Sequence, residues 1–391
     1  MVKRYAIGDV LEIKHGFAFS GEHIVTSDNG VVLVTPGNFR IGGGFQENKC
    51  KFYSGDYPAE YVLPAGTHIV TMTDLSKEID TLGYSAIVPA SERTYLHNQR
   101  IGRIVYKDNC IYPLYMHYLM RTRDYQRFVA NSSSGATVHH TSPDKICKYE
   151  FTAPSRARQE EIADFLHAYD ALIENNRRQI KLLEEAAQRL YKEWFVDLRF
   201  PGHEHTPIVD GVPQGWHRGR ISDISPFTRG KTITKGQTCK GNVPVIAGGL
   251  APAYYHNRAN ARPPVVTISA SGANAGYVSL YQEPVWASDC SYVDANNAEN
   301  IYLLYQACLS MKAAINNLRK GAAQPHVYAS EVNALQILVG DRSIQRKYEA
   351  QVSPLFEKRA LLTHQIILLA EARDRLLPKL MSGEIEVQEL P

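Results

Sequence analysis

The sequence has few of the features that mark secreted, membrane-spanning or metal-rich proteins. Its 391 residues contain six cysteines, scattered singly and without a C-x-x-C pair, so neither a disulfide framework nor a zinc site is indicated and a reducing compartment is favoured. No stretch approaches the length of uninterrupted apolar residues that spans a membrane, and the first ten residues lack an apolar signal region. We therefore expect a cytoplasmic protein without membrane spans.

Charge is nearly balanced overall but unevenly distributed. A formal net charge of +3 is too small by itself to indicate a polyanion as partner. Residues 229–282 nevertheless contain six basic residues and no acid, which fits either a phosphate-facing surface or a solvated basic face. The six are Arg229, Lys231, Lys235, Lys240, Arg258 and Arg262.

An internal repeat organises the chain. The segment GATVHH at 135–140 matches GAAQPH at 321–326 with an offset of 186, and this offset continues without a gap through two helical segments, 158–195 and 344–381. The openings of the two halves also correspond, at an offset of 214. There Ile7, Asp9, Val10, Ile13 and Gly16 match Ile221, Asp223, Ile224, Phe227 and Gly230. The first half is therefore about 28 residues longer before its helix begins.

Both helical segments carry a sustained seven-residue apolar period, which is typical of helices that supercoil on each other. The alternative is two amphipathic helices lying on separate globular cores. Asn176 at a seam position is expected to fix the register, and Arg359 and Arg373 are expected to reach acids on the partner helix. Pro354 predicts that the second helix begins after it or is kinked there. The predicted interface consists of Ile162, Leu166, Tyr169, Ile173, Asn176, Ile180, Leu183, Leu190, Trp194, Leu355, Leu362, Ile366, Leu369, Leu376 and Leu380.

A region of short β-type runs precedes each long helix. In the first half the runs lie at 31–36, 68–73, 85–89 and 102–106, followed by an amphipathic helix at 113–129. In the second half they lie at 243–247, 264–270 and 276–280, followed by a helix at 301–318. The order of element types is the same in both halves.

The predicted fold class is α+β, with a pseudo-twofold internal repeat. Two similar mixed domains are separated by an antiparallel two-helix coiled coil, because the short linker most easily places the second domain at the far end of the first helix. The first helix spans roughly 50 Å, which is on the order of one to one and a half turns of B-DNA. The predicted segments are a first domain at 1–154, a helix at 155–200, a linker at 201–216, a second domain at 217–340, a helix at 341–383 and a tail at 384–391.

No stretch of the sequence matches a catalytic or metal-binding motif completely. The GKT at 230–232 ends like a phosphate-binding loop, but Ser225 stands where that loop requires glycine. The HEH at 203–205 lacks the helical spacing of a zinc site. His139 and His140 could form a metal or acid–base pair, although such residues are more often polar groups of a loop. We therefore predict no catalytic residue, no metal and no cofactor, which leaves a two-headed binding protein.

Three further stretches carry a resemblance to a known family. YKEWFVD at 191–197, VPQGW at 212–216 and RDRLLPKLMSGEI at 373–385, together with the repeated helices, resemble the DNA specificity subunit of type I restriction-modification systems. The resemblance covers essentially the whole chain. It implies two target-recognition domains, each reading one half of a split, asymmetric site on double-stranded DNA, with the coiled coil setting the spacer.

The same resemblance implies partners that carry the chemistry. Two modification subunits would methylate adenine N6 with S-adenosylmethionine, and restriction subunits would translocate and cleave DNA with ATP and magnesium. A related possibility is a single partner that carries both activities. The alternative from another class is a coiled-coil scaffold whose heads bind protein or another ligand.

Contacts with DNA are expected from polar and basic residues in the loops after each opening strand and in the two matching GA-x-x-x-H loops. The histidines that repeat, His140 and His326, could instead cap their loops. The predicted contacts are Lys14, His15, Thr35, Asn38, Arg40, His139 and His140 in the first domain, and Arg229, Lys231, Thr232, Lys235, Lys240 and His326 in the second.

Overall fold

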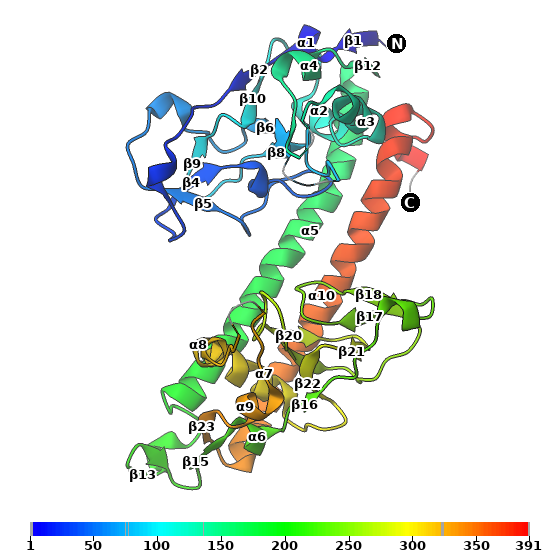
Figure 1. Cartoon of the computed structure of the whole chain (residues 1–391). Coiled ribbons are helices and arrows are strands. Elements are labelled where there is room, and N and C mark those ends of the chain that lie inside the picture. Colours follow the sequence, from blue (N-terminus) through cyan, green and yellow to red (C-terminus); the bar gives the residue numbers. More distant parts are fainter. Residues whose placement is uncertain (1–2, 75, 77, 136, 322–323, 390–391) are drawn as a thin grey trace. The chain divides into compact units, whose positions relative to one another are not determined.

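The computed structural model describes residues 3–74, 76, 78–135, 137–321 and 324–389, and it forms two compact units (Figure 1). Unit 1 comprises residues 1–173 and 367–391, and unit 2 comprises residues 174–366. The long helices α5 (Arg156–Tyr191) and α10 (Arg342–Ser382) contribute to both units. The division therefore falls within the helices, because each half of the helix pair packs on the mixed domain of its own unit.

Unit 1 contains two four-stranded sheets with the strand orders β2-β10-β6-β8 and β3-β5-β4-β9. The first consists of β2 (Leu11–His15), β10 (Ile101–Tyr106), β6 (His68–Thr71) and β8 (Ser85–Ile87). The second consists of β3 (Ile24–Val25), β5 (Lys51–Tyr53), β4 (Val31–Val34) and β9 (Thr94–His97). Two further pairs join β1 (Lys3–Ala6) to β12 (Glu150–Ala153) and β7 (Thr73–Asp74) to β11 (His139–His140).

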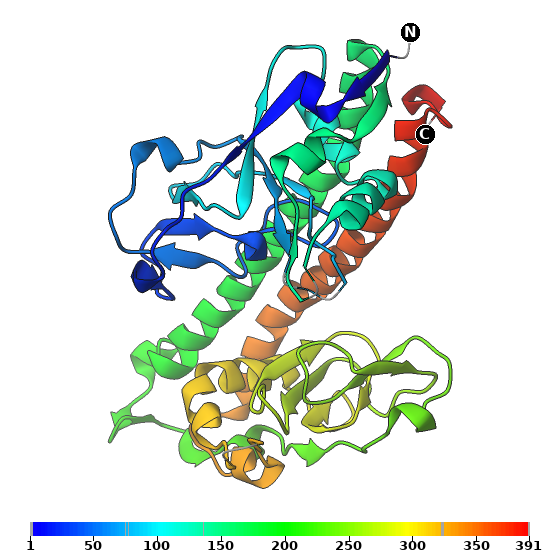
Figure 2. The same cartoon turned by 45° about the horizontal axis from the view of Figure 1, so that its top comes forward.

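The described part of unit 1 also contains the short α-helices α1 (Ile7–Val10), α2 (Pro113–Leu119), α3 (Arg123–Ser132) and α4 (Pro143–Cys147). The core lies between these helices, the β2-β10-β6-β8 sheet and the long helices. It is built from fully buried aromatic and aliphatic side chains such as Tyr115, Tyr125 and Leu11, and it includes Leu166 of α5 and Leu380 of α10. Figures 1 and 2 show the end of α10 beside the start of α5 in this unit.

Unit 2 repeats the plan with a four-stranded sheet of order β16-β22-β19-β20 and a three-stranded sheet of order β18-β17-β21. Its strands are β15 (His217–Arg220), β16 (Thr228–Arg229), β17 (Val243–Ile246), β18 (Tyr254–His256), β19 (Val265–Ser269), β20 (Val278–Tyr281), β21 (Trp286–Ala287), β22 (Cys290–Asp294) and β23 (Gln336–Val339). Its short helices are α6 (Ile221–Ile224), α7 (Ile301–Ser310), α8 (Lys312–Asn317) and α9 (Ala329–Asn333).

The repeat seen in the sequence is a repeat of structure. In both units the opening strand pairs antiparallel with the strand that precedes the long helix, β1 with β12 and β15 with β23. A carboxylate then caps the short helix that follows: Asp9 accepts the Ala6 N–H at 2.7 Å, and Asp223 accepts the Arg220 N–H at 2.9 Å. Such caps supply an acceptor for N–H groups that the first helical turn leaves without a partner.

The linker region contains a short hairpin, β13 (Ile208–Val209) and β14 (Val212–Pro213). Its two ends are held in the core of unit 2, because Phe200 and Trp216 pack against each other at 4.8 Å between ring centroids and Trp216 also packs on Phe195 at 5.5 Å. Phe195 belongs to a π-helical turn, Lys192–Val196, that ends α5.

The predicted strands are confirmed, whereas the helix predicted within each mixed domain needs correction. The helix predicted at 113–129 is divided into α2 and α3, because Thr122 Oγ1 and Gln126 Nε2 donate to the carbonyls of Leu119 and Met120 and end α2 there. The helix predicted at 301–318 is divided at Met311 into α7 and α8.

Of the two alternatives predicted for Pro354, a second long helix that begins after this residue is wrong. Helix α10 begins at Arg342 and continues through Pro354. A proline removes one N–H from the helical ladder. The neighbouring Ser353 hydroxyl donates to the carbonyl of Glu349 at 2.7 Å, and the preceding turn is held by Tyr348, whose hydroxyl donates to the carbonyl of Ala187 at 3.0 Å.

Within each unit the long helices pair antiparallel. In unit 1, Asp170 of α5 meets Arg373 of α10. In unit 2, the amide of Asn176 donates to Gln365 at 3.2 Å, and Glu184 forms an ion pair with Arg359 at 2.6 Å. As the residue number increases along α5, the number of the contacting residue on α10 decreases, so the helices are antiparallel as predicted.

All fifteen predicted seam residues are buried or half-buried. The ends of the helices nevertheless serve the domain cores as well as the helix pair: Ile162 and Leu380 lie in the core of unit 1, and Trp194 lies in that of unit 2. Both interpretations of the amphipathic helices therefore hold, for different parts of their length.

Candidate nucleic-acid interface

Strand β2 in unit 1 and strand β16 in unit 2 each end at a glycine that lies very close to the backbone of another segment. At Gly16, after β2, a Cβ would lie 2.3 Å from the Asn98 carbonyl oxygen, and at Gly230, after β16, it would lie 2.4 Å from that of Ser288. Only glycine fits these positions, because any side chain would collide with backbone. The residues immediately before them, His15 and Arg229, are both exposed and are both predicted DNA contacts.

In unit 2 the predicted contact Arg229 belongs to a polar cluster. Its guanidinium Nη2 lies 2.9 Å from Asp289 Oδ1, and the hydroxyl of Ser271 donates to Asp289 Oδ2. Ser271 also forms a backbone bridge with His326, another predicted contact. The sheet thus brings together four segments that are far apart in the sequence, at residues 229–231, 271–272, 289 and 324–326.

The two GA-x-x-x-H loops close in the same way. In unit 1 the backbone N–H of Ser134 donates to the His140 carbonyl at 3.0 Å, and that of His140 donates back at 2.8 Å. In unit 2 Lys320 and His326 exchange the same two hydrogen bonds, at 3.0 and 2.8 Å. The repeated histidine therefore sits at the base of each loop by its backbone, which accounts for its repetition.

The imidazole rings of these histidines differ in surroundings. His140 is exposed, and its Nδ1 lies 3.2 Å from the Thr73 hydroxyl. His326 is half-buried and stacks on Tyr328. His139 is half-buried, and its Nδ1 is a buried atom without a hydrogen-bond partner among the described residues.

Beside the His140 loop, unit 1 carries a second loop that the sequence pattern did not reveal. The buried carboxylate of Asp74 accepts the N–H groups of Ser76, Thr81 and Leu82 at 2.6 to 3.0 Å and the Thr81 hydroxyl at 2.7 Å. Burial alone would raise the pKa of Asp74, but these donors bring that pKa below its usual value. Asp74 pairs with His139 through β7 and β11, so the two loops share one edge.

One predicted contact is corrected by the structure. Asn38 is fully buried: its Oδ1 accepts the Thr35 N–H at 2.9 Å, and its amide donates to the Gln46 carbonyl at 3.2 Å. The same role in unit 2 belongs to Gln237, whose Oε1 accepts the Thr234 N–H at 2.9 Å. Asn38 is therefore a turn residue whose polar atoms are already used, and a DNA contact by it is not supported.

The neighbouring predicted contacts lie on the same turn and loop. Thr35 and Arg40 are half-buried, and Arg40 closes a short loop with Gly43 and Gly44 through backbone hydrogen bonds of 3.0 Å. Lys14 is exposed on β2 and lies 3.0 Å from Glu12.

In unit 2 the basic stretch is a surface feature. All six of its basic residues are exposed, as is Thr232. Arg229 has an ion-pair partner, whereas Lys231, Lys235, Lys240, Arg258 and Arg262 have none among the residues that the structure describes.

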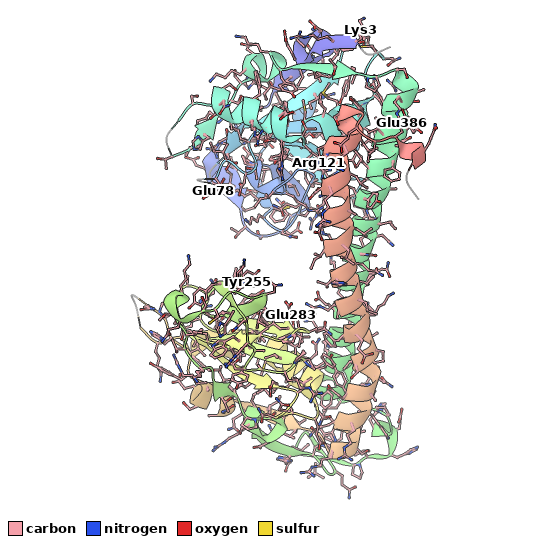
Figure 3. The ribbon with its side chains drawn as sticks, turned by 90° about the vertical axis from the view of Figure 1, so that its right-hand side faces the viewer. Lys3, Glu78, Arg121, Tyr255, Glu283 and Glu386 are labelled. Atoms are coloured by element: carbon pink, nitrogen blue, oxygen red, sulfur yellow. The ribbon has the colours of Figure 1, made fainter. Side chains whose placement is uncertain are left out.

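A buried polar node in unit 1 joins the mixed domain to both long helices. Asp170 of α5 accepts the Tyr118 hydroxyl and Arg121 Nη1, each at 2.7 Å, and pairs with Arg373 of α10. Arg121 Nε also donates to the Gly42 carbonyl at 2.8 Å. Figure 3 shows Arg121 against the long helices.

The node depends on charge compensation. Burial would raise the pKa of Asp170, but the two guanidinium groups hold it well below its usual range. Since Arg121 connects Asp170 to the loop that carries Arg40, the node ties a predicted contact loop to the helix pair.

Neither a metal site nor a membrane span is found in the described part of the chain. No group of three or more histidine, cysteine or acidic side chains is placed to hold a metal there. Of the helices among those residues, none has the length and apolar character needed to span a bilayer.

Comparison with known proteins identifies the family. Residues 2–185 and 213–371 match the model of the type I restriction modification DNA specificity domain. The type I restriction enzyme MjaIX specificity subunit of Methanocaldococcus jannaschii is 27% identical over 355 residues, covering 84% of this chain and 80% of that protein. The HindI specificity subunit of Haemophilus influenzae is 22% identical over 364 residues, covering 71% and 78%.

A solved structure shares the fold. The S subunit of a type I restriction-modification system from M. genitalium superposes with a TM-score of 0.61 at 16% identity, over 97% of this chain and 96% of that chain. The chain therefore belongs to the family of type I restriction modification DNA specificity domains, as its motifs predicted. It is the sequence-recognition subunit of such a system and not a catalytic one.

Proposed function

We propose that each mixed domain reads one half of a split, asymmetric site on double-stranded DNA. The observation that carries this proposal is that both units share one framework, closed by the same backbone hydrogen bonds at His140 and His326, but present different loop residues. Two copies of one reader with different contact residues suit two different half-sites.

A domain exchange tests this division. Replacing residues 217–340 with the corresponding segment of another family member should change one half-site and leave the other unchanged. The readout is single-molecule mapping of methylated adenines in cells that also express the modification subunit. A simultaneous change in both half-sites would contradict the division.

We further propose that the helix pair sets the spacer between the half-sites. The support is a register fixed by polar contacts, the Asn176–Gln365 hydrogen bond and the Arg359–Glu184 ion pair. Seven residues inserted into each helix, after Arg177 in α5 and after Leu362 in α10, add roughly 10 Å. The spacer should then lengthen by about three base pairs while both half-sites stay the same. Altered half-sites with an unaltered spacer would refute this ruler.

Docking of two modification subunits is proposed from exposed apolar residues on the long helices. Leu182 of α5 and Leu368 of α10 are equivalent at the repeat offset of 186, and their exposed fractions are 63% and 50%. One lies in each unit, as two copies of one partner require. Those subunits would use S-adenosylmethionine, and restriction subunits would use ATP and magnesium. The assembly would act on DNA in the cytoplasm.

Native mass spectrometry of the reconstituted complex tests the docking. Leu182→Glu and Leu368→Glu should each leave one modification subunit bound, and the double variant should leave none. The control Asn131→Glu places the same charge at an exposed position on α3 and should bind two. Two bound subunits in both single variants would exclude these leucines from the interface.

A further inference from the structure

The Arg229 cluster in unit 2 has the composition of a base-reading device. We propose that Arg229 reads a guanine, in the major groove of the half-site that the second domain recognises. Asp289 is the positioning residue that fixes the guanidinium of Arg229. This inference rests on the proposed DNA-reading function and specifies one base of it. Three side chains from separate segments take part: Arg229 ends β16, Asp289 precedes β22, and Ser271 follows β19.

The hydrogen-bond pattern leaves a reading edge available. Arg229 uses Nη2 toward Asp289 at 2.9 Å, and its Nε and Nη1 donors have no partner within the described part of the chain. Its side chain is 53% exposed, so a ligand can reach these donors. Asp289 Oδ1 takes one N–H of Nη2, and the second N–H of Nη2 forms a parallel pair with the N–H of Nε or of Nη1. Two such parallel donors of a planar guanidinium match the O6 and N7 acceptors of guanine, which is the commonest specific contact to a base edge.

The acid in the cluster argues against a phosphate contact. Asp289 neutralises Arg229, and a carboxylate beside a phosphate would be repelled by it. A guanine edge carries no net charge, so the Asp289 carboxylate does not repel it as it would repel a phosphate. Lys231, Lys235 and Lys240 are exposed without an ion-pair partner among the described residues, and they suit the backbone.

The backbone around the cluster is held firmly. The N–H of Gly230 donates to the Cys290 carbonyl at 2.8 Å, and that of Lys231 donates to the Ala287 carbonyl at 2.9 Å. These bonds fix the end of β16 beside the segment that carries Asp289. Ser271 donates to the second oxygen of Asp289, so the carboxylate is also held from its other side.

The first domain carries a different residue at the matching place. The offset of 214 aligns Arg229 with His15, which precedes Gly16 as Arg229 precedes Gly230. An imidazole lacks the five-donor fork of a guanidinium. The two domains therefore present different chemistry at equivalent positions, which accords with an asymmetric site.

The test uses the full chain assembled with its modification subunits. The recognised motif is first mapped by adenine methylation. Binding is then measured against a panel of duplexes in which each base pair of that motif is changed in turn, at several salt concentrations. The variants are Arg229→Ala, Arg229→Lys, Asp289→Asn and Ser271→Ala, with Lys231→Ala as the control at an exposed basic position.

Arg229→Ala should abolish discrimination at one G·C pair of the second half-site, a loss of roughly 5- to 150-fold in selectivity, and leave other positions unchanged. Arg229→Lys should lose as much, because a point charge cannot replace the fork. Asp289→Asn should weaken discrimination at the same pair without weakening binding to unrelated DNA. Ser271→Ala should have the same effect to a smaller degree. Lys231→Ala should weaken all duplexes alike and reduce the salt slope by about 0.9.

The result that would overturn the inference is an Arg229→Ala variant that weakens every duplex equally and reduces the salt slope, as for a phosphate contact. The proposed function would stand in that case, because selective binding by the unaltered chain is measured in the same panel. Absence of selectivity in the unaltered chain would instead refute the proposed function. Hydrogen exchange of β19 and β22 checks that each variant is folded.

Discussion

Removal of the Asp170 carboxylate should destabilise unit 1 selectively. The variant Asp170→Ala leaves Arg121 and Arg373 facing each other, with side chains that are only 3% and 13% exposed. Removing one partner of a buried ion pair typically costs about 3 to 5 kcal/mol, because the remaining charge stays buried without compensation. Asp170 itself is 22% exposed, so we expect a cost near the lower end, about 3 kcal/mol.

Hydrogen exchange measured peptide by peptide is the appropriate assay, since a chain of two units does not guarantee a single unfolding transition. Protection of α2, which carries Tyr118, should fall by roughly 100-fold in Asp170→Ala. Protection of α7 in unit 2 serves as the internal control and should not change. Arg373 keeps its ion pair with Asp374 at 2.7 Å, so Arg121 is the guanidinium left without a carboxylate. The double variant Asp170→Ala/Arg373→Met removes the second guanidinium that faces Arg121 and should recover part of the loss.

The pH dependence of the same peptides provides a second check. Because the folded pKa of Asp170 lies below its unfolded value, its stabilisation is present above about pH 4 and is lost as the pH falls below that value. Acidification from pH 5 to pH 3 should therefore lower the protection of α2 more in the unaltered chain than in Asp170→Asn. Equal losses of protection in α2 and α7, or a change in α2 below about threefold in Asp170→Ala, would show that the Asp170 carboxylate does not stabilise unit 1 selectively.

Three further predictions concern pH, helix pairing and salt. Burial raises the pKa of Glu349 to about 7, although its carboxylate accepts two N–H groups of α7. Unit 2 should therefore lose on the order of 3 kcal/mol of stability between pH 5 and pH 8, and Glu349→Gln should abolish this pH dependence. The assay is thermal unfolding followed by tryptophan fluorescence, since all three tryptophans lie in unit 2. Asn176→Leu should stabilise the helix pair by about 1 kcal/mol in the same assay, while a lower midpoint would contradict its role as a polar seam residue. Replacing Lys231, Lys235 and Lys240 by alanine should reduce the salt slope of DNA binding by about 0.9 for each phosphate that is no longer neutralised, and an unchanged slope would exclude these lysines from the DNA backbone.

Periodicity and repeat offsets predicted the framework because they depend on local spacing. The seam positions follow from the seven-residue period, and the matching of domain openings follows from a fixed offset. The acid that meets Arg373 could not be named, because Asp170 lies 203 residues away and the choice depends on the register between two helices. The division between α2 and α3 depends on Thr122 and Gln126 side chains that compete for carbonyl groups, which an apolar pattern does not reveal.

Among the candidate DNA contacts too, local composition predicted some features, whereas others depend on residues that are distant in the sequence or on the geometry of a turn. The exposure of the basic stretch in unit 2 follows from its composition, since lysine and arginine are rarely buried without partners. The Arg229–Asp289 pair could not be predicted, because strand pairing brings together two residues that are 60 positions apart. Asn38 was misassigned because an asparagine in a turn serves equally well as a surface contact or as the acceptor that holds the turn.

Whether the two domains read a split DNA site is tested most directly by a genome-wide map of methylated adenines in cells that express this chain with its modification subunit. The expected result is one motif composed of two different half-sites separated by a spacer of fixed length and unspecified sequence. A contiguous motif, a palindromic one, or methylation without any motif would contradict it.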